Sequence, residues 1–170
     1  MDVTIKIRNI FLKPEIDDCD QYRIFKDDYG QITRNWEVNA IRINDEIFFV
    51  PNEKWHQLHG QERKNAYQAA VEDADLAKQF CAGSFYYMGL IAGANITMRI
   101  GNETIEDMLY ESLWGVESNA GEYMGEIYRE LLNKLRYRLS EMGIGMLELD
   151  AAFEKFAKTS DKDLRWEVLR

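Results

Sequence analysis

The longest uncharged stretch of the chain, from Phe80 to Met98, constrains the fold more than any other feature. It runs for nineteen residues and contains Gly89-Leu-Ile-Ala-Gly93, a spacing of small residues typical of closely packed helices. Polar residues such as Asn95 interrupt it and no basic cluster flanks it, which disfavours a membrane span. We therefore predict a buried central helix here, and a homo-oligomer contact if that helix is partly exposed.

The bulk properties indicate an ordinary globular protein. A chain of 170 residues without Pro-rich or Gly/Ser-rich tracts predicts a single domain over residues 1–170. The two cysteines, Cys19 and Cys81, form no CxxC pair, and no signal peptide is visible, so we expect a reduced, cytoplasmic setting. Cys81 lies among apolar residues, which predicts a buried side chain.

The first fifty residues predict strands. Val3, Ile5 and Ile7 alternate with polar residues, the period of a half-buried strand. The segment Tyr22–Phe25 is also β-prone, and Pro51 ends the last apolar run. The pattern predicts an antiparallel sheet of three or four short strands.

From Trp55 onward the apolar period becomes helical, and we predict about five helices over residues 55–170. The fold class is therefore α+β, with the sheet first and the helices after it. Beyond the central apolar helix and the amphipathic helix before it, the expected helices are Thr104 to about Trp114, Asn119 to Gly143, Glu148–Lys158 and Asp161–Leu169.

Two histidines lie in a weak metal-binding pattern. Glu53 and His56 form an ExxH unit, and His59 and Glu62 follow at spacings of three. On one helix face these four side chains could begin a carboxylate–histidine site. Gly60 interrupts such a helix, however, and the chain has no further histidine. We therefore expect partly exposed histidines at a strand-to-helix junction, and neither a metal nor another cofactor.

No motif supports an enzyme. The chain lacks GxSxG, GxxxxGKS/T, GxGxxG and HExxH, as well as any zinc-type cysteine cluster. Scattered carboxylates can still build an acid–base site, so a small enzyme or ligand-binding domain stays an alternative, with its pocket between the sheet and the central apolar helix.

Charge distribution is the most informative feature for function. The net charge is −9, and no Lys or Arg occurs between Arg99 and Arg129. On helices, Asp107 with Glu111 and Glu122 with Glu126 would form like-charged i,i+4 pairs, which folding alone does not favour. The acids of this stretch, taken as candidate partner-binding residues, are Glu103, Glu106, Asp107, Glu111, Glu117, Glu122 and Glu126.

We expect these acids to bind a protein with a basic surface, flanked by Tyr110 and Tyr123 as exposed aromatic partners. The favoured function is a non-enzymatic inhibitor or antagonist of a basic or nucleic-acid-binding protein. Such a protein would imitate DNA, as small counter-defence proteins of phages and mobile elements do. Direct nucleic-acid binding is disfavoured, because the only dense basic run lies on a helix that begins with acids. A solvated acidic face and a structural or assembly subunit are the alternatives.

Overall fold

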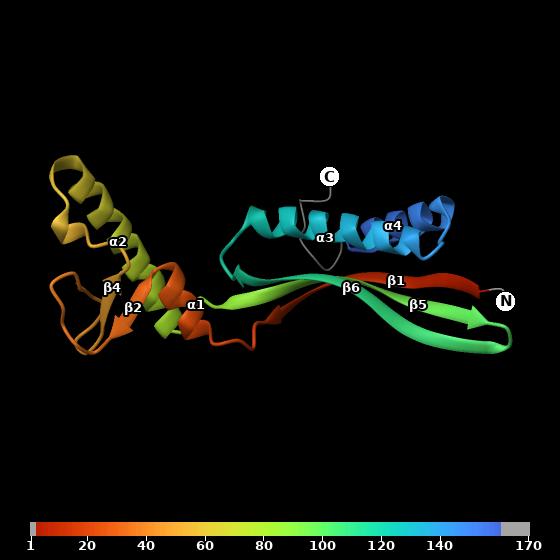
Figure 1. Cartoon of the computed structure of the whole chain (residues 1–170), viewed down its shortest axis with the longest axis horizontal. Coiled ribbons are helices and arrows are strands. Elements are labelled where there is room, and N and C mark those ends of the chain that lie inside the picture. Colours follow the sequence, from red (N-terminus) through yellow and green to blue (C-terminus); the bar gives the residue numbers. More distant parts are fainter. Residues whose placement is uncertain (1–2, 161–170) are drawn as a thin grey trace. The chain divides into compact units, whose positions relative to one another are not determined.

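The computed structural model describes residues 3–160, whose contacts divide the chain into two compact units (Figure 1). Unit 1 contains the chain up to Ile16 and again from Met88 onward, whereas unit 2 is Asp17–Tyr87. Unit 2 is thus inserted between two segments that pair with each other, since Ile16 lies opposite Met88. The α+β class is confirmed, and the single-domain organisation of residues 1–170 stays a prediction.

Unit 1 contains a three-stranded antiparallel sheet in the order β1-β5-β6. Its strands are β1 (Val3–Ile16), β5 (Tyr87–Ile100) and β6 (Glu103–Glu117). The predicted strand at the N-terminus is confirmed and extends to Ile16. Its register with β5 shifts between Ile7 and Asn9, as at a β-bulge.

The predicted central helix at Phe80–Met98 is wrong, because most of this stretch is β5. On β5, Leu90, Ala92, Ala94 and Ile96 are all buried, at the period of two that a strand requires. The GxxxG glycines do not mediate helix packing. A Cβ at Gly89 would lie 2.4 Å from the Trp114 ring, and one at Gly93 would lie 2.3 Å from the Phe11 ring. Both glycines therefore make room for aromatic rings.

The predicted helix from Thr104 to about Trp114 is also wrong, because these residues belong to β6. Gly101 and Asn102 are the only residues between β5 and β6, and Gly101 has a φ of 60°. A two-residue turn with positive φ folds the chain back into a hairpin. Ile100 then lies opposite Glu103 and Gly89 opposite Trp114, which agrees with the close approach of Gly89 to the Trp114 ring.

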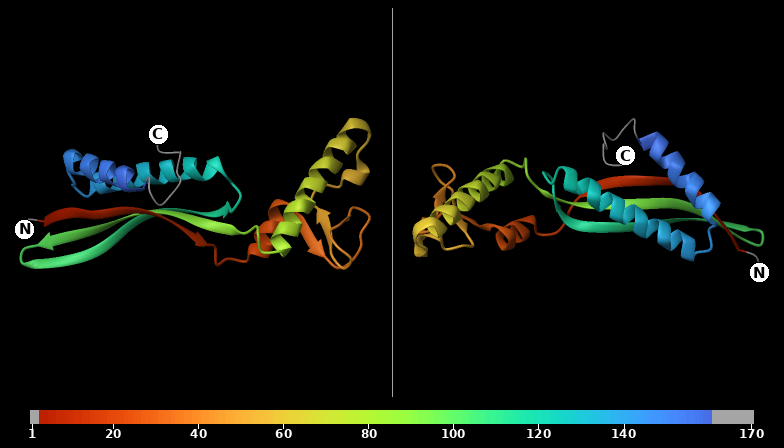
Figure 2. Two further views of the ribbon diagram at one scale, coloured as in Figure 1. Left: turned by 180° about the vertical axis from the view of Figure 1, so that it is seen from behind. Right: turned by 90° about the horizontal axis from the view of Figure 1, so that it is seen from above.

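Two helices cover one face of this sheet, α3 (Glu122–Glu141) on β6 and α4 (Met146–Ser160) on β1 (Figure 2). The helices predicted for Asn119–Gly143 and Glu148–Lys158 are confirmed in type and place. In α3, Leu131, Leu135 and Leu139 are buried against the sheet layer. The helix predicted for Asp161–Leu169 lies outside the described residues.

Unit 2 packs two helices with a second small sheet of order β2-β4-β3. Its core is aromatic, because Phe25, Phe49, Phe85 and Tyr87 are all fully buried. The rings of Phe25 and Phe80 stack with centroids 4.8 Å apart. The elements are α1 (Gln21–Asp28), β2 (Gly30–Thr33), β3 (Ile41–Arg42), β4 (Phe48–Pro51), the 3-10 helix η1 (Trp55–Gln57) and α2 (Gly60–Cys81).

Several predictions for this region change. Tyr22–Phe25 lies in α1 and not in a strand, since Asp20 caps the helix by accepting a hydrogen bond from the Arg23 N–H. Residues 1–50 do hold four strands, but they belong to two sheets. Residues 3–160 contain four α-helices, of which α1 lies before residue 55; three α-helices therefore lie between residues 55 and 160, against about five expected over 55–170. Within the same residues, no helix is long and apolar enough to cross a membrane.

Cys81 is exposed, so the prediction that it is buried is wrong. It is the last residue of α2, whose buried face is formed by Ala66, Ala70, Ala74 and Ala77. Cys19 is exposed as well.

Candidate interaction surfaces

Five of the seven predicted acids lie on β6 and not on a helix: Glu103, Glu106, Asp107, Glu111 and Glu117. Neighbouring residues of a strand point to opposite faces, so Glu106 and Asp107 lie on different sides of the sheet. Asp107 and Glu111 are about 13 Å apart along a strand, too far to repel each other as an i,i+4 helix pair would. The argument that this pair opposes folding therefore fails.

Two of these acids have cationic partners from outside the base-free stretch. Arg8 on β1 contacts Glu106, with the guanidinium Nη1 2.8 Å from the carboxylate Oε1. Arg138 on α3 pairs with Glu111, whose side chain is only 21% exposed. Glu111 therefore faces the helix layer, as its position in the hairpin register predicts. The sequence of this stretch contains no Lys or Arg, but in the fold arginines from β1 and α3 lie beside two of its acids.

The other two predicted acids begin α3. Glu122 and Glu126 are exposed and one turn apart, and neither makes an ion pair with a described residue. Tyr123 lies between them in the sequence and is 58% exposed. On the next turn, the Glu130 carboxylate accepts a hydrogen bond from Lys134 at 2.7 Å. Two carboxylates about 6 Å apart along a rigid helix, with an exposed tyrosine beside them, form the part of the predicted site that the fold keeps together.

Tyr110 and Tyr123 are both exposed, as predicted, but they belong to different layers of unit 1. Tyr110 is on β6, opposite Gly93 in the hairpin register, whereas Tyr123 is on α3. The acids are also divided, because Asp107 is about 33 Å from Glu117 along β6 at the usual rise of a strand. The nine predicted residues therefore do not form one patch.

The four weak metal candidates lie on four different segments. Glu53 lies in the loop between β4 and η1, His56 is in η1, His59 is extended before α2, and Glu62 is in the first turn of α2. The His56 Nδ1 lies 2.8 Å from the Asn39 Oδ1, and the Asn39 Nδ2 donates to the Glu53 carbonyl oxygen at 2.9 Å. Both histidines lie between β4 and α2, half-buried and exposed respectively, as expected. Among residues 3–160, no group of three or more His, Cys, Asp or Glu side chains could hold a metal ion.

The pocket predicted between the sheet and a central apolar helix has no place in this fold, because that helix is β5. A cavity of about 260 Å³ lies instead between β1 and α4. Its walls include Ile7, Ile10, Ala152 and Phe156, with Glu148 at 3.4 Å from the Ile7 backbone nitrogen. Arg8, Lys155 and Thr159 also line it, so the walls of this cavity are partly polar.

The chain was compared with known proteins at three levels, and no family model, no curated protein and no solved structure matches it. Its function is therefore argued from its own residues.

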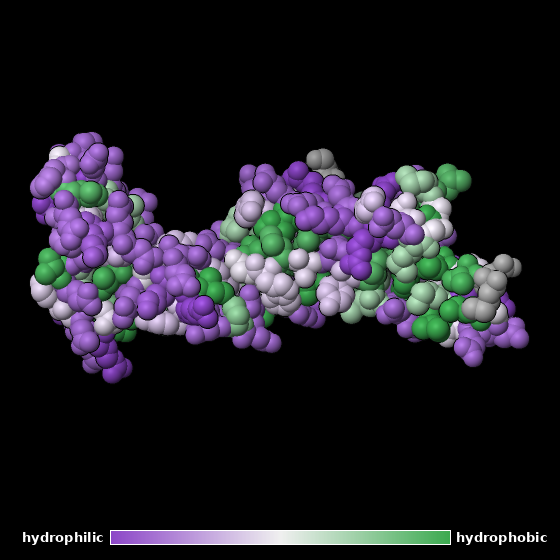
Figure 3. All heavy atoms as spheres, viewed as in Figure 1, coloured by the Kyte–Doolittle hydropathy of each residue, from purple (hydrophilic) through white to green (hydrophobic). Residues whose placement is uncertain are grey.

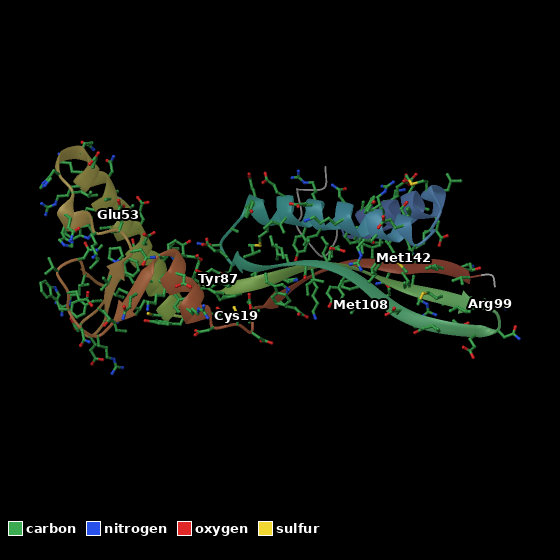
Figure 4. The ribbon with its side chains drawn as sticks, viewed as in Figure 1. Cys19, Glu53, Tyr87, Arg99, Met108 and Met142 are labelled. Atoms are coloured by element: carbon green, nitrogen blue, oxygen red, sulfur yellow. The ribbon has the colours of Figure 1, made fainter. Side chains whose placement is uncertain are left out.

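Sequence reasoning did not single out the sheet face opposite α3 and α4, which we call the open face. Hydrophobic residues reach the surface of unit 1 among hydrophilic ones (Figure 3), and Figure 4 labels Met108 on β6 and Arg99 near the hairpin end of β5. The signal of the open face in the sequence is weak: two aromatic residues four apart on β6, a single one on β1, and two glycines four apart on β5. The aromatic and basic residues of the face are Lys6, Arg8, Phe11, Lys13, Arg99, Tyr110 and Trp114.

Proposed function

We propose that the protein is a non-enzymatic interaction module that binds a protein with a basic surface through the start of α3. Glu122, Tyr123 and Glu126 form this surface, which we call the α3 acidic surface. The observation that carries the proposal is that both carboxylates are exposed without a cationic partner among the described residues. The partner class is a basic, nucleic-acid-binding protein, and the module acts as its antagonist.

Electrostatics favours this assignment over solubility alone. Glu122 lies in the first turn of α3, where a carboxylate stabilises the helix dipole. Glu126 lies beyond the first turn, where that effect has largely decayed. Its repulsion with Glu122 costs the helix a few tenths of a kcal/mol. A helix fixes the backbone positions of the two residues, so their carboxylates can replace neighbouring phosphates in the groove of a basic protein without reordering of the backbone.

Tyr123 supplies binding energy that the two carboxylates alone do not. Exposed charges steer association and set its salt dependence, but they add little affinity by themselves. Tyrosine is enriched among the residues that carry binding energy at interfaces. Tyr123 stands between the two carboxylates in the sequence and is 58% exposed. An exposed aromatic side chain beside two carboxylates on one helix surface favours a specific contact over a merely solvated face.

The test is charge reversal with a matched control. The variant Glu122→Lys/Glu126→Lys and the control Glu103→Lys/Asp107→Lys change the net charge equally, at different ends of unit 1. Each tagged protein is used to capture partners from a lysate of the native host, and the captured proteins are quantified by mass spectrometry. We expect the α3 variant to lose a basic partner that the wild type and the control retain. Retention by all three proteins, or equal loss from both variants, would refute the proposal.

A further inference from the structure

The open face carries a second binding function, separate from the α3 acidic surface. We infer that it binds single-stranded nucleic acid, with bases stacked on its aromatic side chains and phosphates held by its lysines and arginines. The two surfaces belong to opposite layers of unit 1, since α3 covers the other side of the sheet (Figures 1 and 2). The inference therefore does not depend on the proposed function.

Two of the three aromatic side chains of the open face, Trp114 and Phe11, lie over glycines, and of these two only Trp114 is exposed. Three atoms of the Trp114 indole lie 2.4–2.7 Å from where a Cβ of Gly89 would stand, and Phe11 approaches Gly93 in the same way. Each ring rests on bare backbone of the central strand, so its position is fixed by the sheet. Trp114 is nevertheless 46% exposed, and Tyr110 is 51% exposed. Ring surface held in place and open to solvent is what base stacking requires.

The stability of the sheet explains why two of these rings lie over glycines, but not why Trp114 and Tyr110 are exposed and surrounded by cations. Packing an aromatic ring over a strand glycine stabilises a sheet, and cross-strand pairs of this kind contribute about 0.2–1 kcal/mol each. That role does not require the outer side of the ring to stay in water. It also does not require cations around the rings.

The charge of the open face is opposite to that of the chain. Lys6, Arg8, Lys13 and Arg99 outnumber the acids Glu15 and Glu106 on this side of the sheet, although the net charge of the protein is −9. Glu106 pairs with Arg8, and Glu15 pairs with Lys13. Lys6 and Arg99 are exposed and make no ion pair with a described residue; the Arg99 Nε donates to the Gly101 carbonyl oxygen at 3.3 Å, which leaves its other guanidinium nitrogens available to phosphates.

The same features disfavour other occupants. A second copy stacked through this face would bring its own cations against these, which is costly when they are desolvated. Double-stranded DNA hides the faces of its bases within the stack, so the aromatic side chains would have nothing to stack on. The prediction against direct nucleic-acid binding rested on basic runs along the sequence. Cations that different strands bring together in the fold form no basic run in the sequence.

The experiment measures fluorescence anisotropy of labelled oligonucleotides with the full chain. The probes are single strands of about 15 nucleotides, in DNA and RNA, and a duplex of the same DNA sequence. We expect micromolar binding at low salt, at least about tenfold tighter for a single strand than for the duplex, and weaker at higher salt. Absence of binding at about 100 μM protein, or equal binding to the duplex, overturns the inference.

Variants then locate the site. Tyr110→Ala/Trp114→Ala should weaken single-strand binding by at least about tenfold, since each stacked base contributes that much. The matched control is Trp36→Ala/Tyr137→Ala, which removes a tryptophan and a tyrosine that are exposed elsewhere on the protein and should leave binding unchanged. Equal losses in the two double variants would overturn the inference.

A second pair of variants tests the inference even if Tyr110→Ala/Trp114→Ala fails to fold. Lys6→Gln/Arg99→Gln leaves both glycine-supported rings in place and should lower the salt dependence by about one ion per removed contact. The control is Arg129→Gln/Lys134→Gln on α3. An unchanged salt slope in Lys6→Gln/Arg99→Gln means that phosphates do not bind here. If the wild-type protein self-associates without nucleic acid, and Tyr110→Ala/Trp114→Ala abolishes this association, a second copy occupies the open face. Either result overturns the inference.

Discussion

Tyr128 makes the stability of unit 1 depend on pH in the alkaline range. It lies in α3, is 2% exposed, and packs in the layer between the helices and the sheet. Burial disfavours the charged phenolate and raises the pKa of Tyr128 to about 12 from its ordinary value of 10.0. The variant Tyr128→Phe removes the titrating group and keeps the ring.

The sign and the size follow from linkage. Because the folded-state pKa lies above the unfolded one, the contribution of Tyr128 is fully present below about pH 10 and is lost as the pH rises through 10 toward 12. Each pKa unit corresponds to about 1.4 kcal/mol, so the loss is about 1.4 kcal/mol at pH 11 and at most about 3 kcal/mol. Tyr128→Phe should not show this loss, although other groups still titrate in both proteins.

The assay is urea unfolding at pH 7, 10 and 11, followed by methyl NMR signals of Leu131 and Leu135. The free energy of unfolding of the wild type should fall by about 1.4 kcal/mol more than that of Tyr128→Phe between pH 7 and pH 11. Phe156→Leu is the control, because it destabilises the same unit without removing a titrating group. Its pH dependence should run parallel to that of the wild type. A parallel curve for Tyr128→Phe would refute the assignment of the raised pKa to burial of this phenol.

Three further substitutions test the packing of each unit. Gly30→Ala places a Cβ 2.3 Å from a backbone carbonyl oxygen of β4, at a φ of +152°. It should therefore destabilise unit 2 by about 2–4 kcal/mol. A thermal unfolding midpoint equal to that of the wild type would contradict this. Asn39→Ala leaves the Glu53 carbonyl without its side-chain donor and should cost unit 2 about 1–3 kcal/mol in urea unfolding. Leu135→Ala should cost unit 1 about 2–5 kcal/mol, whereas Leu147→Ala, 88% exposed, should change the free energy by less than about 0.5 kcal/mol; equal effects would refute the assigned core.

The helices of unit 1 could be predicted because their information is local. The apolar face of α3 repeats at 3.6 residues, and acids precede bases along it. The strands β5 and β6 could not be predicted in the same way. Leu90, Ala92 and Ala94 alternate with two glycines and the apolar Ile91, so no alternation of apolar and polar residues indicates a strand. Gly89 and Gly93 suit a helix contact by spacing alone, and only the positions of Trp114 and Phe11 assign them to a sheet.

Charge shows the same dependence on partners that are distant in the sequence. Between Arg99 and Arg129 the chain has no base, yet Arg8 reaches Glu106 from a strand at the other edge of the sheet, and Arg138 reaches Glu111 from the helix above it. Counting charges along the chain therefore overestimates the negative potential of β6. The carboxylates of Glu122 and Glu126 lack such a partner among the described residues, so the potential of α3 survives folding. For this reason, a partner with a basic surface should bind the start of α3, and a negatively charged partner should bind the open face.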